Sequence, residues 1–599
     1  MIPNKLHNLL QRTPGKDKKT TFNTNTEINT SKQLGRYIIA MFTFFIAATI
    51  ISGCKKDSFL DVLNTSNVSE PTVYASESAA DLVLNDIYNQ LPDFNGFYFE
   101  PFDAWSDNLM TGFNWNISSG AARTKSNINS STDLFYTWAP ASMWFDWTTL
   151  YTNIRKCNVF IQGLQSSSLS ETYKNQRLGE AMVMRAFFYQ DLWIMYGGVP
   201  IITKPDNFNT MGDSVFHARA SFDSTFLFLD NDLAAAAQLL PQNNGNDGNG
   251  RVTQGAALTL KGWIELFYAS PLNNPTNDLN RWKAAAATNA QVMQLGYQLY
   301  PKYNELFLST GNTNNEGILY KQYLSLKQGS VVIGYQGPNY VGTNWLSWGG
   351  STPTQELVDD YSMANGMAIT DPGSGYDPQN PYANREPRLK QSILYNGNTF
   401  NGTVFLSAVG SGPNAIDLAD ASDETNTGYC TKKRMDTTVN IFQWAASPQN
   451  YYFFRYAEVL LNYAEAQNEA AGPDASVYAA MDQIRTRAGI PTFSEVYPGV
   501  SQSQMRTLIR RERRVELALE NKRYFDLLRW KIADVNLNHV MHGMKITSNG
   551  SGGYTYQVIP AIPSGAPQWS FDASKNYLLP IPFGVLGQNS KLTQNPGYN

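Results

Sequence analysis

The segment Leu178-Gly-Glu-Ala-Met-Val-Met-Arg-Ala-Phe-Phe-Tyr-Gln-Asp-Leu-Trp-Ile-Met-Tyr196 is followed by Gly197-Gly-Val-Pro200. Its apolar residues recur at intervals of three and four, which is a helical period with a wide apolar face. The two glycines supply a residue able to adopt a positive φ, and the proline cannot continue a helix. The stretch therefore predicts a long, largely buried helix that ends at Tyr196.

Similar helical patterns occur along much of the chain. They cover residues 76–91, 142–163, 219–240, 252–269, 281–295, 452–471, 474–488 and 502–530. Several of these patterns are adjacent pairs joined by a short break, such as the two on either side of Gly472-Pro473. Adjacent helix pairs are typical of tetratricopeptide-like arrays. Because the strict repeat consensus is absent, we expect an irregular array.

The regions between the helical patterns have a different texture. Residues 296–451 are rich in Gly, Asn, Pro and aromatic residues, and residues 97–140 and 541–599 are similar. Loops this long are uncommon unless they serve a function. We therefore predict a mostly α fold, with helical parts at about 70–295 and 452–530 and a loop-rich half that contains short strands.

Composition excludes several classes of protein. The 599 residues include 46 basic and 50 acidic side chains, and 13% of residues are aromatic against 16% charged. Intrinsic disorder needs few aromatic residues and a high net charge, and nucleic-acid binding needs a basic surplus. The composition shows neither property, so we expect a folded chain with no nucleic-acid partner.

The N-terminus predicts export and a lipid anchor. Residues 1–36 are polar and basic, and residues 37–51 form one apolar run that stops at Ser52-Gly53-Cys54. A run of about 15 residues is typical of a signal peptide, since a membrane-spanning helix needs about 20. The residues up to Cys54 also resemble a bacterial lipobox, which predicts lipidation of Cys54 and removal of residues 1–53. The alternative is a short uncleaved anchor helix.

Enzyme and cofactor motifs are absent from the sequence. The four histidines form no H-E-x-x-H pattern, and neither a C-x-x-C nor a P-loop occurs. Cys157 and Cys430 are compatible with one disulfide or with two buried thiols. We expect no catalytic residues, no metal centre and no cofactor. The only metal alternative is a structural calcium ion in the acidic loop that contains Asp417, Asp420, Asp423 and Glu424.

The charged run 509–530 has two interpretations. Three glutamates, Glu512, Glu516 and Glu520, follow one another at four-residue intervals, where like charges repel. Cations must therefore face them. The run is either a catalytic acid pair or an ion network that joins helices, and we favour the network because nearby arginines lower carboxyl pKa values. The candidate cations are Arg485, Arg487, Arg513 and Arg523.

Several short segments, in this order, carry a family resemblance. They are Cys54 with Phe59-Leu-Asp61, Gly179 through Pro200, Pro353 through Tyr361, Arg385 through Leu389, Gly428-Tyr429 before Lys432-Lys433, Arg455 through Glu458 with Asn462 through Ala466, Arg485 through Ala488, Arg511 through Glu520, Arg523 through Trp530, Tyr577 through Pro582, and Asn595 through Tyr598. With these segments the chain resembles the SusD-like (RagB/SusD) nutrient-binding outer-membrane lipoproteins.

The resemblance implies a place and a role. It implies tetratricopeptide-like helix pairs beside an irregular loop-rich half, in one SusD-like domain over residues 54–599. It also implies a lipid-anchored outer-membrane protein, facing the cell exterior, that works as the lid of a SusC-like TonB-dependent transporter. Members of the family capture oligosaccharides or, in some cases, peptides for uptake.

Exposed aromatic rings are the candidate ligand contacts. Sugars present apolar C–H faces and hydroxyl rims, so a glycan site needs flat rings beside amide or carboxylate groups. Two loop segments have this composition, and the resemblance places family ligand contacts in loops at about these positions. The candidate residues are Trp105, Asp107, Asn108 and Trp115 in the first segment and Tyr340, Trp345 and Trp348 in the second.

Core packing is the alternative for any single tryptophan. Trp138, Trp144 and Trp147 lie in or beside a predicted helix, so we expect them in the core. The function predicted is non-catalytic capture of oligosaccharide and its delivery to the transporter. The alternatives are peptide capture, a secreted glycoside hydrolase with two paired carboxylates, and an interaction scaffold that would not need the loop tryptophans.

Overall fold

The computed structural model describes residues 73–112, 124–132, 145–243, 250–410, 414–419, 425–564, 566 and 568–598. All of them belong to one compact unit, Glu70–Asn599. The other unit, Met1–Ser69, lies outside the described residues. Removal of residues 1–53 and lipidation of Cys54 therefore stay predictions.

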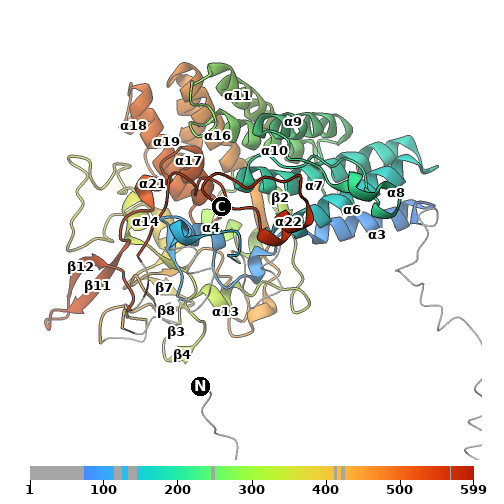
Figure 1. Ribbon diagram of the computed structural model, residues 1–599. Helices are drawn as coiled ribbons and strands as arrows, with labels where there is room; N and C mark the ends of the chain where they lie inside the picture. Colours follow the sequence, from blue (N-terminus) through green and yellow to red (C-terminus); the bar gives the residue numbers. More distant parts are fainter. Residues whose placement is uncertain are drawn as a thin grey trace, which may run out of the picture. The chain divides into compact units, whose positions relative to one another are not determined.

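Among the described residues, nine helices form a continuous array in which each packs against a neighbour. The helices α9, α10, α11 and α16 of this array lie side by side in Figure 1. This confirms the mostly α, irregular array of helix pairs. In chain order the nine are α3 (Glu77–Asn89), α6 (Trp147–Gln165), α7 (Glu171–Tyr196), α9 (Phe222–Leu239), α10 (Gln254–Ala269), α11 (Leu279–Met293), α16 (Tyr456–Ala471), α17 (Ala475–Ala488) and α19 (Gln502–Glu516).

Helix α7 ends at Tyr196, as its sequence predicts, and begins at Glu171, before the quoted segment Leu178–Tyr196. It begins after Ser170, whose side chain accepts a hydrogen bond from the Tyr173 backbone, and it ends at Gly197 with φ +81°. Every residue from Val183 to Tyr196 is buried. The ring of Trp193 stacks on Phe222 at 4.6 Å, which joins α7 to α9. The long helix is thus the centre of the main core.

The prediction of one helix over 502–530 was wrong. Helix α19 ends at Glu516, and a second helix, α20, covers Arg523–Arg529. Between them Leu519 and Asn521 adopt φ values of +62° and +61°. Asn521 is held there because its backbone N–H donates to Asp103, which lies far away in the sequence. A long-range contact therefore overrides the local helical pattern.

Most of the loop-rich half lies between α11 and α16, and the rest comes from the segment before α6 and from the residues after α21 (Ala533–Asn536). Its strands are short and pair antiparallel in twos, and residues 452–455, expected to begin a helix, belong to one of them. The pairs are β1 (Leu109–Met110) with β5 (Thr352–Pro353), β2 (Gly317–Lys321) with β10 (Tyr451–Arg455), β3 (Tyr340–Val341) with β4 (Asn344–Trp345), β6 (Ile393–Leu394) with β9 (Cys430–Thr431), β7 (Thr399–Phe400) with β8 (Thr403–Val404), and β11 (His542–Ser548) with β12 (Tyr554–Pro560).

Short α-helices lie between these longer helices and strands. Besides α20, they are α4 (Pro101–Ala104), α8 (Phe208–Met211), α12 (Tyr303–Leu306), α13 (Val332–Gln336), α14 (Gln355–Asp360), α15 (Pro387–Ser392), α18 (Phe493–Val496), α21 (Ala533–Asn536) and α22 (Phe583–Gln588). No helix among the described residues is long and apolar enough to cross a membrane.

The remaining core predictions have clear outcomes. Cys157 and Cys430 are two free, buried thiols, and burial raises the pKa of each to about 12. Trp147 is in the main core, as expected. Trp138 and Trp144 lie outside the described residues. A separate, smaller core of ten residues, which includes Val341 and Leu346, lies within the loop-rich half.

Candidate ligand-binding site

Two neighbouring tryptophans are exposed in the loop-rich half. Trp345 is 43% exposed and Trp348 is 37% exposed. Their ring centres are 5.1 Å apart, and the ring planes meet at 77°. Trp345 lies on β4, in the group of short strands β3, β4, β7 and β8 seen in Figure 1. Both rings thus remain open to solvent while they contact each other.

The β3–β4 hairpin positions the first of these rings. Tyr340 lies directly opposite Trp345 in the pair, so the two side chains share one face of the hairpin. The two-residue turn begins at Gly342, whose φ of +59° suits glycine. Tyr340 is half-buried, and its backbone exchanges hydrogen bonds with the side chain of Asn414 at 3.0 Å. The structure therefore brings Tyr340 beside Trp345.

Buried neighbours hold the segment after the hairpin. Leu346 is 1% exposed and belongs to the small core of the loop-rich half. The backbone N–H groups of Leu346 and Ser347 both donate to the carbonyl oxygen of Asn339, at 2.8 and 3.4 Å. The exposed rings therefore stand on a segment that is fixed by its own core.

A third tryptophan, Trp444, packs against this pair. The half-buried ring of Trp444 lies 5.6 Å from Trp345, and its indole N–H donates to the Leu346 carbonyl oxygen at 3.1 Å. We call Trp345, Trp348 and Trp444 the aromatic platform. Sequence reasoning missed Trp444, although it follows Phe442-Gln443 in a stretch of the same aromatic and amide composition. Phe442 is 49% exposed and extends the apolar surface.

The polar groups around the platform are neutral. Thr343, Asn344 and Gln443 are exposed and neighbour the platform rings in sequence. Residues 324–349 and 437–450 contain no Asp or Glu. The platform can thus offer flat apolar faces with amide and hydroxyl groups beside them, but no carboxylate from its own segments.

The first predicted segment has a different environment. Trp105 is 2% exposed and lies edge-on to Tyr524, with ring centres 5.4 Å apart. Asp107 is ion-paired with Arg523 at 2.7 Å, and Asn108 accepts a hydrogen bond from Arg514 at 2.8 Å. The expectation that these side chains are exposed was wrong, because buried arginines hold the segment inside. Trp115 lies outside the described residues.

Two buried acids in or beside this segment have raised pKa values. Burial raises the pKa of Glu100 to about 7, although Arg434 opposes the shift, and burial raises that of Asp103 to about 6. Raised carboxyl pKa values are typical of catalytic acids. Here, however, both side chains are at most 1% exposed, and both accept hydrogen bonds from Asn521. Their position gives a substrate no access.

The charged run forms an ion network between elements. Glu516 pairs with Arg388 at 2.8 Å, with Arg455 at 2.7 Å and with Arg487. Burial alone would raise the pKa of Glu516, but the three guanidinium groups outweigh burial and hold the pKa well below its usual range. A carboxyl group in that state is a poor general acid. The arrangement favours the structural interpretation.

The partners of the network differ in part from those predicted. Arg487 does contact Glu516, and Arg485 lies 3.4 Å from Glu512. Arg513 instead pairs with Asp526 and Glu458, and Arg523 pairs with Asp107. The prediction for Arg513 and Arg523 was wrong, because these two arginines serve acids on other elements.

The structure bears only partly on the calcium alternative. Asp420, Asp423 and Glu424 of the acidic loop lie outside the described residues. Within the described ranges no group of three or more His, Cys, Asp or Glu side chains could hold a metal ion. A calcium ion in that loop therefore stays a prediction.

Comparison with known families gives two matches that together span most of the chain. A family model described as "SusD family" matches residues 315–598. A second, described as "Starch-binding associating with outer membrane", matches residues 58–265. The first match includes the aromatic platform, and the second includes α3 to most of α10.

Curated relatives agree with these matches. A SusD-like protein of Bacteroides ovatus is 25% identical over 509 residues, which are 81% of this chain and 81% of the relative. SusD-like protein P2 of Formosa agariphila is 36% identical over 157 residues, which are 25% of this chain and 26% of the relative.

Solved structures share the fold. A SusD-like protein from Bacteroides fragilis is 26% identical with a TM-score of 0.72, covering 89% of this chain and 99% of the other. A SusD-like carbohydrate-binding protein from the same species is 25% identical with a TM-score of 0.69, covering 87% and 100%. A laminarin-binding SusD-like protein shares the fold at 23% identity with a TM-score of 0.63, covering 88% and 100%. The chain therefore belongs to the SusD-like family.

Proposed function

We propose that this chain captures oligosaccharide at the aromatic platform, without reacting with it, and delivers it to a SusC-like TonB-dependent transporter. The observation that carries the proposal is the exposure of Trp345 and Trp348 on a segment fixed by its own core. Contiguous exposed apolar patches on a protein surface mark ligand-binding or interaction sites, and the adjacent rings of Trp345 and Trp348 form such a patch. The neutral groups of Thr343, Asn344 and Gln443 are suited to hydrogen bonds with sugar hydroxyls.

The absence of acids from the platform segments supports a non-catalytic role. Glycoside hydrolysis needs two carboxyl groups that flank the scissile bond, about 5 to 10 Å apart. Residues 324–349 and 437–450 supply none. Asp436, which borders the second segment, is buried, and its oxygens accept hydrogen bonds from Ser309, Thr438 and Ser447.

The family and the N-terminal sequence support the proposed delivery to a transporter and the proposed location of the protein. The model that matches residues 58–265 carries the outer membrane in its description. The segment that ends at Cys54 supports a lipid anchor there, since several acyl chains on one residue would hold the chain stably. We accordingly propose a lipid-anchored protein that faces the cell exterior, with the transporter as its partner.

Calorimetry with tryptophan variants tests the binding site. We expect one of a panel of oligosaccharides, including starch-type and laminarin-type chains, to bind the wild type. Trp345→Ala and Trp348→Ala should each weaken that binding by about 2 kcal/mol, or roughly thirtyfold, because each removes a central aromatic contact. The melting temperature should stay near that of the wild type, since both rings are exposed.

The controls separate the alternatives. Phe583→Ala removes an aromatic ring that is 69% exposed on α22, outside the platform, and it should leave affinity unchanged. Unchanged affinity in both tryptophan variants would overturn the site. Shorter sugars appearing during incubation would support a hydrolase instead, and binding of an oligopeptide panel with no glycan binding would support peptide capture.

A further inference from the structure

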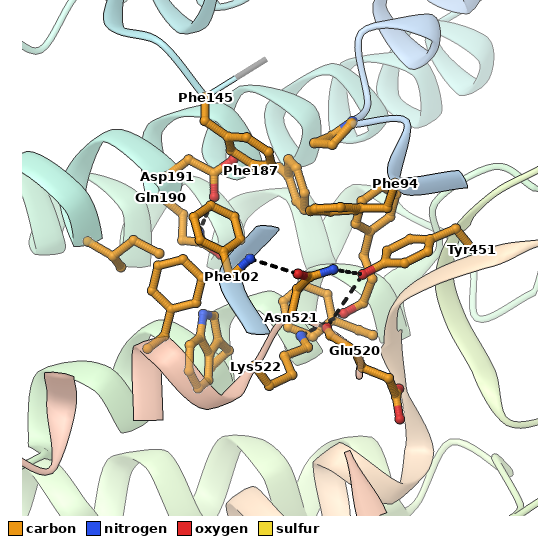
Figure 2. A pocket seen from close by; sticks show the side chains of 16 residues that line it. Phe94, Phe102, Phe145, Phe187, Gln190, Asp191, Tyr451, Glu520, Asn521 and Lys522 are labelled. Atoms are coloured by element: carbon orange, nitrogen blue, oxygen red, sulfur yellow. Dashed lines mark hydrogen bonds between the residues drawn. The ribbon is translucent and has the colours of Figure 1, made fainter. Parts of the chain in front are cut away.

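A cavity of about 60 Å³ lies among buried side chains where α7, β10 and α20 meet. Its walls are mainly aromatic, and Figure 2 shows the rings of Phe94, Phe102, Phe145 and Phe187 around it. A water molecule needs about 10 to 15 Å³ of such volume. The cavity therefore has room for about four non-hydrogen atoms.

One carboxyl group in this cavity lacks a partner. Asp191 on α7 is 7% exposed, and its Oδ1 accepts a hydrogen bond from the Gln190 side chain at 2.7 Å (Figure 2). Its Oδ2 has no hydrogen-bond partner among the described residues. A buried polar atom without a partner is costly, so such atoms are rare in native structures.

Asp191 is the exception among the buried acids of the described residues. All the others form an ion pair with a Lys or Arg side chain, apart from Asp103 and Asp436. Both oxygens of each of those two accept hydrogen bonds. Asp191 alone among them has neither an ion pair nor a second hydrogen bond, and it lines the cavity.

The charged neighbours in the cavity are already compensated. The Lys522 ammonium group lies 2.8 Å from Glu458 and donates to the Phe453 carbonyl oxygen. Glu520 is paired with Lys433 and Arg455. The charge of Lys522 acts on Asp191 from a distance and lowers its pKa, but among the described residues neither charged neighbour forms an ion pair with it. The Lys522 ammonium also lies 4.2 Å from the Phe454 ring centre, so the same wall already accommodates one ammonium ion.

We propose that the cavity binds a small organic ammonium ion, which donates a hydrogen bond to Asp191 Oδ2 and lies against the surrounding aromatic rings. Aromatic walls attract ammonium ions through the negative faces of the rings. A calcium or magnesium ion fits poorly, because it needs about six oxygen ligands and the cavity offers one unpartnered oxygen. The size of the cavity restricts the ligand to about four non-hydrogen atoms, so methylammonium, which has two, fits.

Binding should depend on pH in a defined direction. Burial raises the pKa of Asp191 to about 8, and the hydrogen bond from Gln190 and the positive charge of Lys522 offset part of this shift. Below that pH the carboxyl group must release a proton before it pairs with a cation. Affinity for methylammonium should therefore rise about tenfold per pH unit up to about pH 8 and then level off, while the ligand itself stays protonated to about pH 10.

Calorimetric titration with methylammonium chloride, against sodium chloride at equal ionic strength, tests the proposal. At pH 8.5 the full chain should bind one methylammonium ion. Asp191→Asn keeps the size of the side chain and should weaken binding at least tenfold and abolish its pH dependence. Asp213→Asn changes an exposed acid and should behave as the wild type. Tetramethylammonium should not bind, because it is too large.

A second variant tests the same cavity if Asp191→Asn does not fold. Ile194→Phe fills the cavity and leaves Asp191 in place, so it should also prevent binding. Equal affinity of the wild type and a folded Asp191→Asn variant, retained binding in Ile194→Phe, or no saturable binding by the wild type would each overturn the proposal. Oligosaccharide affinity should be the same in all these variants, which separates this site from the aromatic platform.

Discussion

Two tryptophan-bearing segments look alike in sequence and have opposite environments. Residues 103–108 and 340–348 each place Trp beside Asn and Ser, yet Trp105 is 2% exposed and Trp345 is 43% exposed. The first segment contains two acids, and Asp107 is drawn inside by Arg523, a residue 416 positions later. The second contains no charged residue. The composition of a loop does not by itself determine whether its tryptophan is exposed, because the buried partners of the charged residues in the loop also matter.

The strongest test of this comparison is a pair of tryptophan deletions. Trp105→Ala should lower the free energy of unfolding by about 3 to 5 kcal/mol, because it leaves a cavity in the main core. Trp345→Ala should change that free energy by about 0.5 kcal/mol or less, as for other exposed positions. Urea denaturation followed by circular dichroism measures both. Equal losses would remove the distinction between the two segments.

Acid should affect the buried ion pairs but not the platform. Burial would raise the pKa of Glu465, but Arg529, which pairs with it at 2.5 and 2.7 Å, contributes most to lowering the pKa to about 2. A carboxyl pKa lowered in the folded state adds stability above about pH 4.5, and this stability is lost as pH falls toward 2. Glu465→Gln should therefore be less stable at pH 7 and lose less stability over that range.

Urea denaturation at pH values from 7 down to the acid transition gives the slope of the free energy of unfolding against pH. Glu171→Gln, at a side chain that is 79% exposed, is the matched control and should keep the wild-type slope. Oligosaccharide affinity should stay flat between about pH 5 and 8, since the platform segments hold no acid. A steep change in affinity over that interval would mean that an ionisable group contributes to the site.

The smallest effect is expected at the β3–β4 turn. Gly342→Ala places an L side chain at φ +59°, which costs about 1 kcal/mol. Room is available, since the nearest atom to the new Cβ is 3.7 Å away, so the cost is conformational. We expect a few-fold loss of affinity. Gly373→Ala, at φ +84° in open space, should cost similar stability and leave affinity unchanged. Equal losses of affinity in the two variants would mean that the β3–β4 turn does not position the binding site.

Local pattern predicted most of the helices. The segments 252–269 and 474–488 became α10 and α17 with boundaries within two residues, because the helical period depends only on neighbours in sequence. The same reasoning failed over 502–530. There, the positive φ of Asn521 is set by a hydrogen bond to Asp103, which no local window contains.

The site was predicted in part for the same reason. The uncharged, Gly-rich stretch around Trp345 and Trp348 made both rings candidates for exposure, and the structure exposes both. Trp444 was missed, because it joins the platform across about 100 positions through its contact with Trp345. The partners of Glu516 were also incomplete, since Arg388 and Arg455 come from distant elements.

Residue pattern is thus sufficient for most of the helix array and for the family, and total charge predicts no nucleic-acid partner. Those properties depend on short-range periodicity, on total charge and on motifs read in order. The folded chain alone separates Trp345 from Trp105 and leaves Asp191 unpaired beside a cavity. The physical reason is that burial and ion pairing join residues hundreds of positions apart, and the free energy of a charge depends on which partner reaches it.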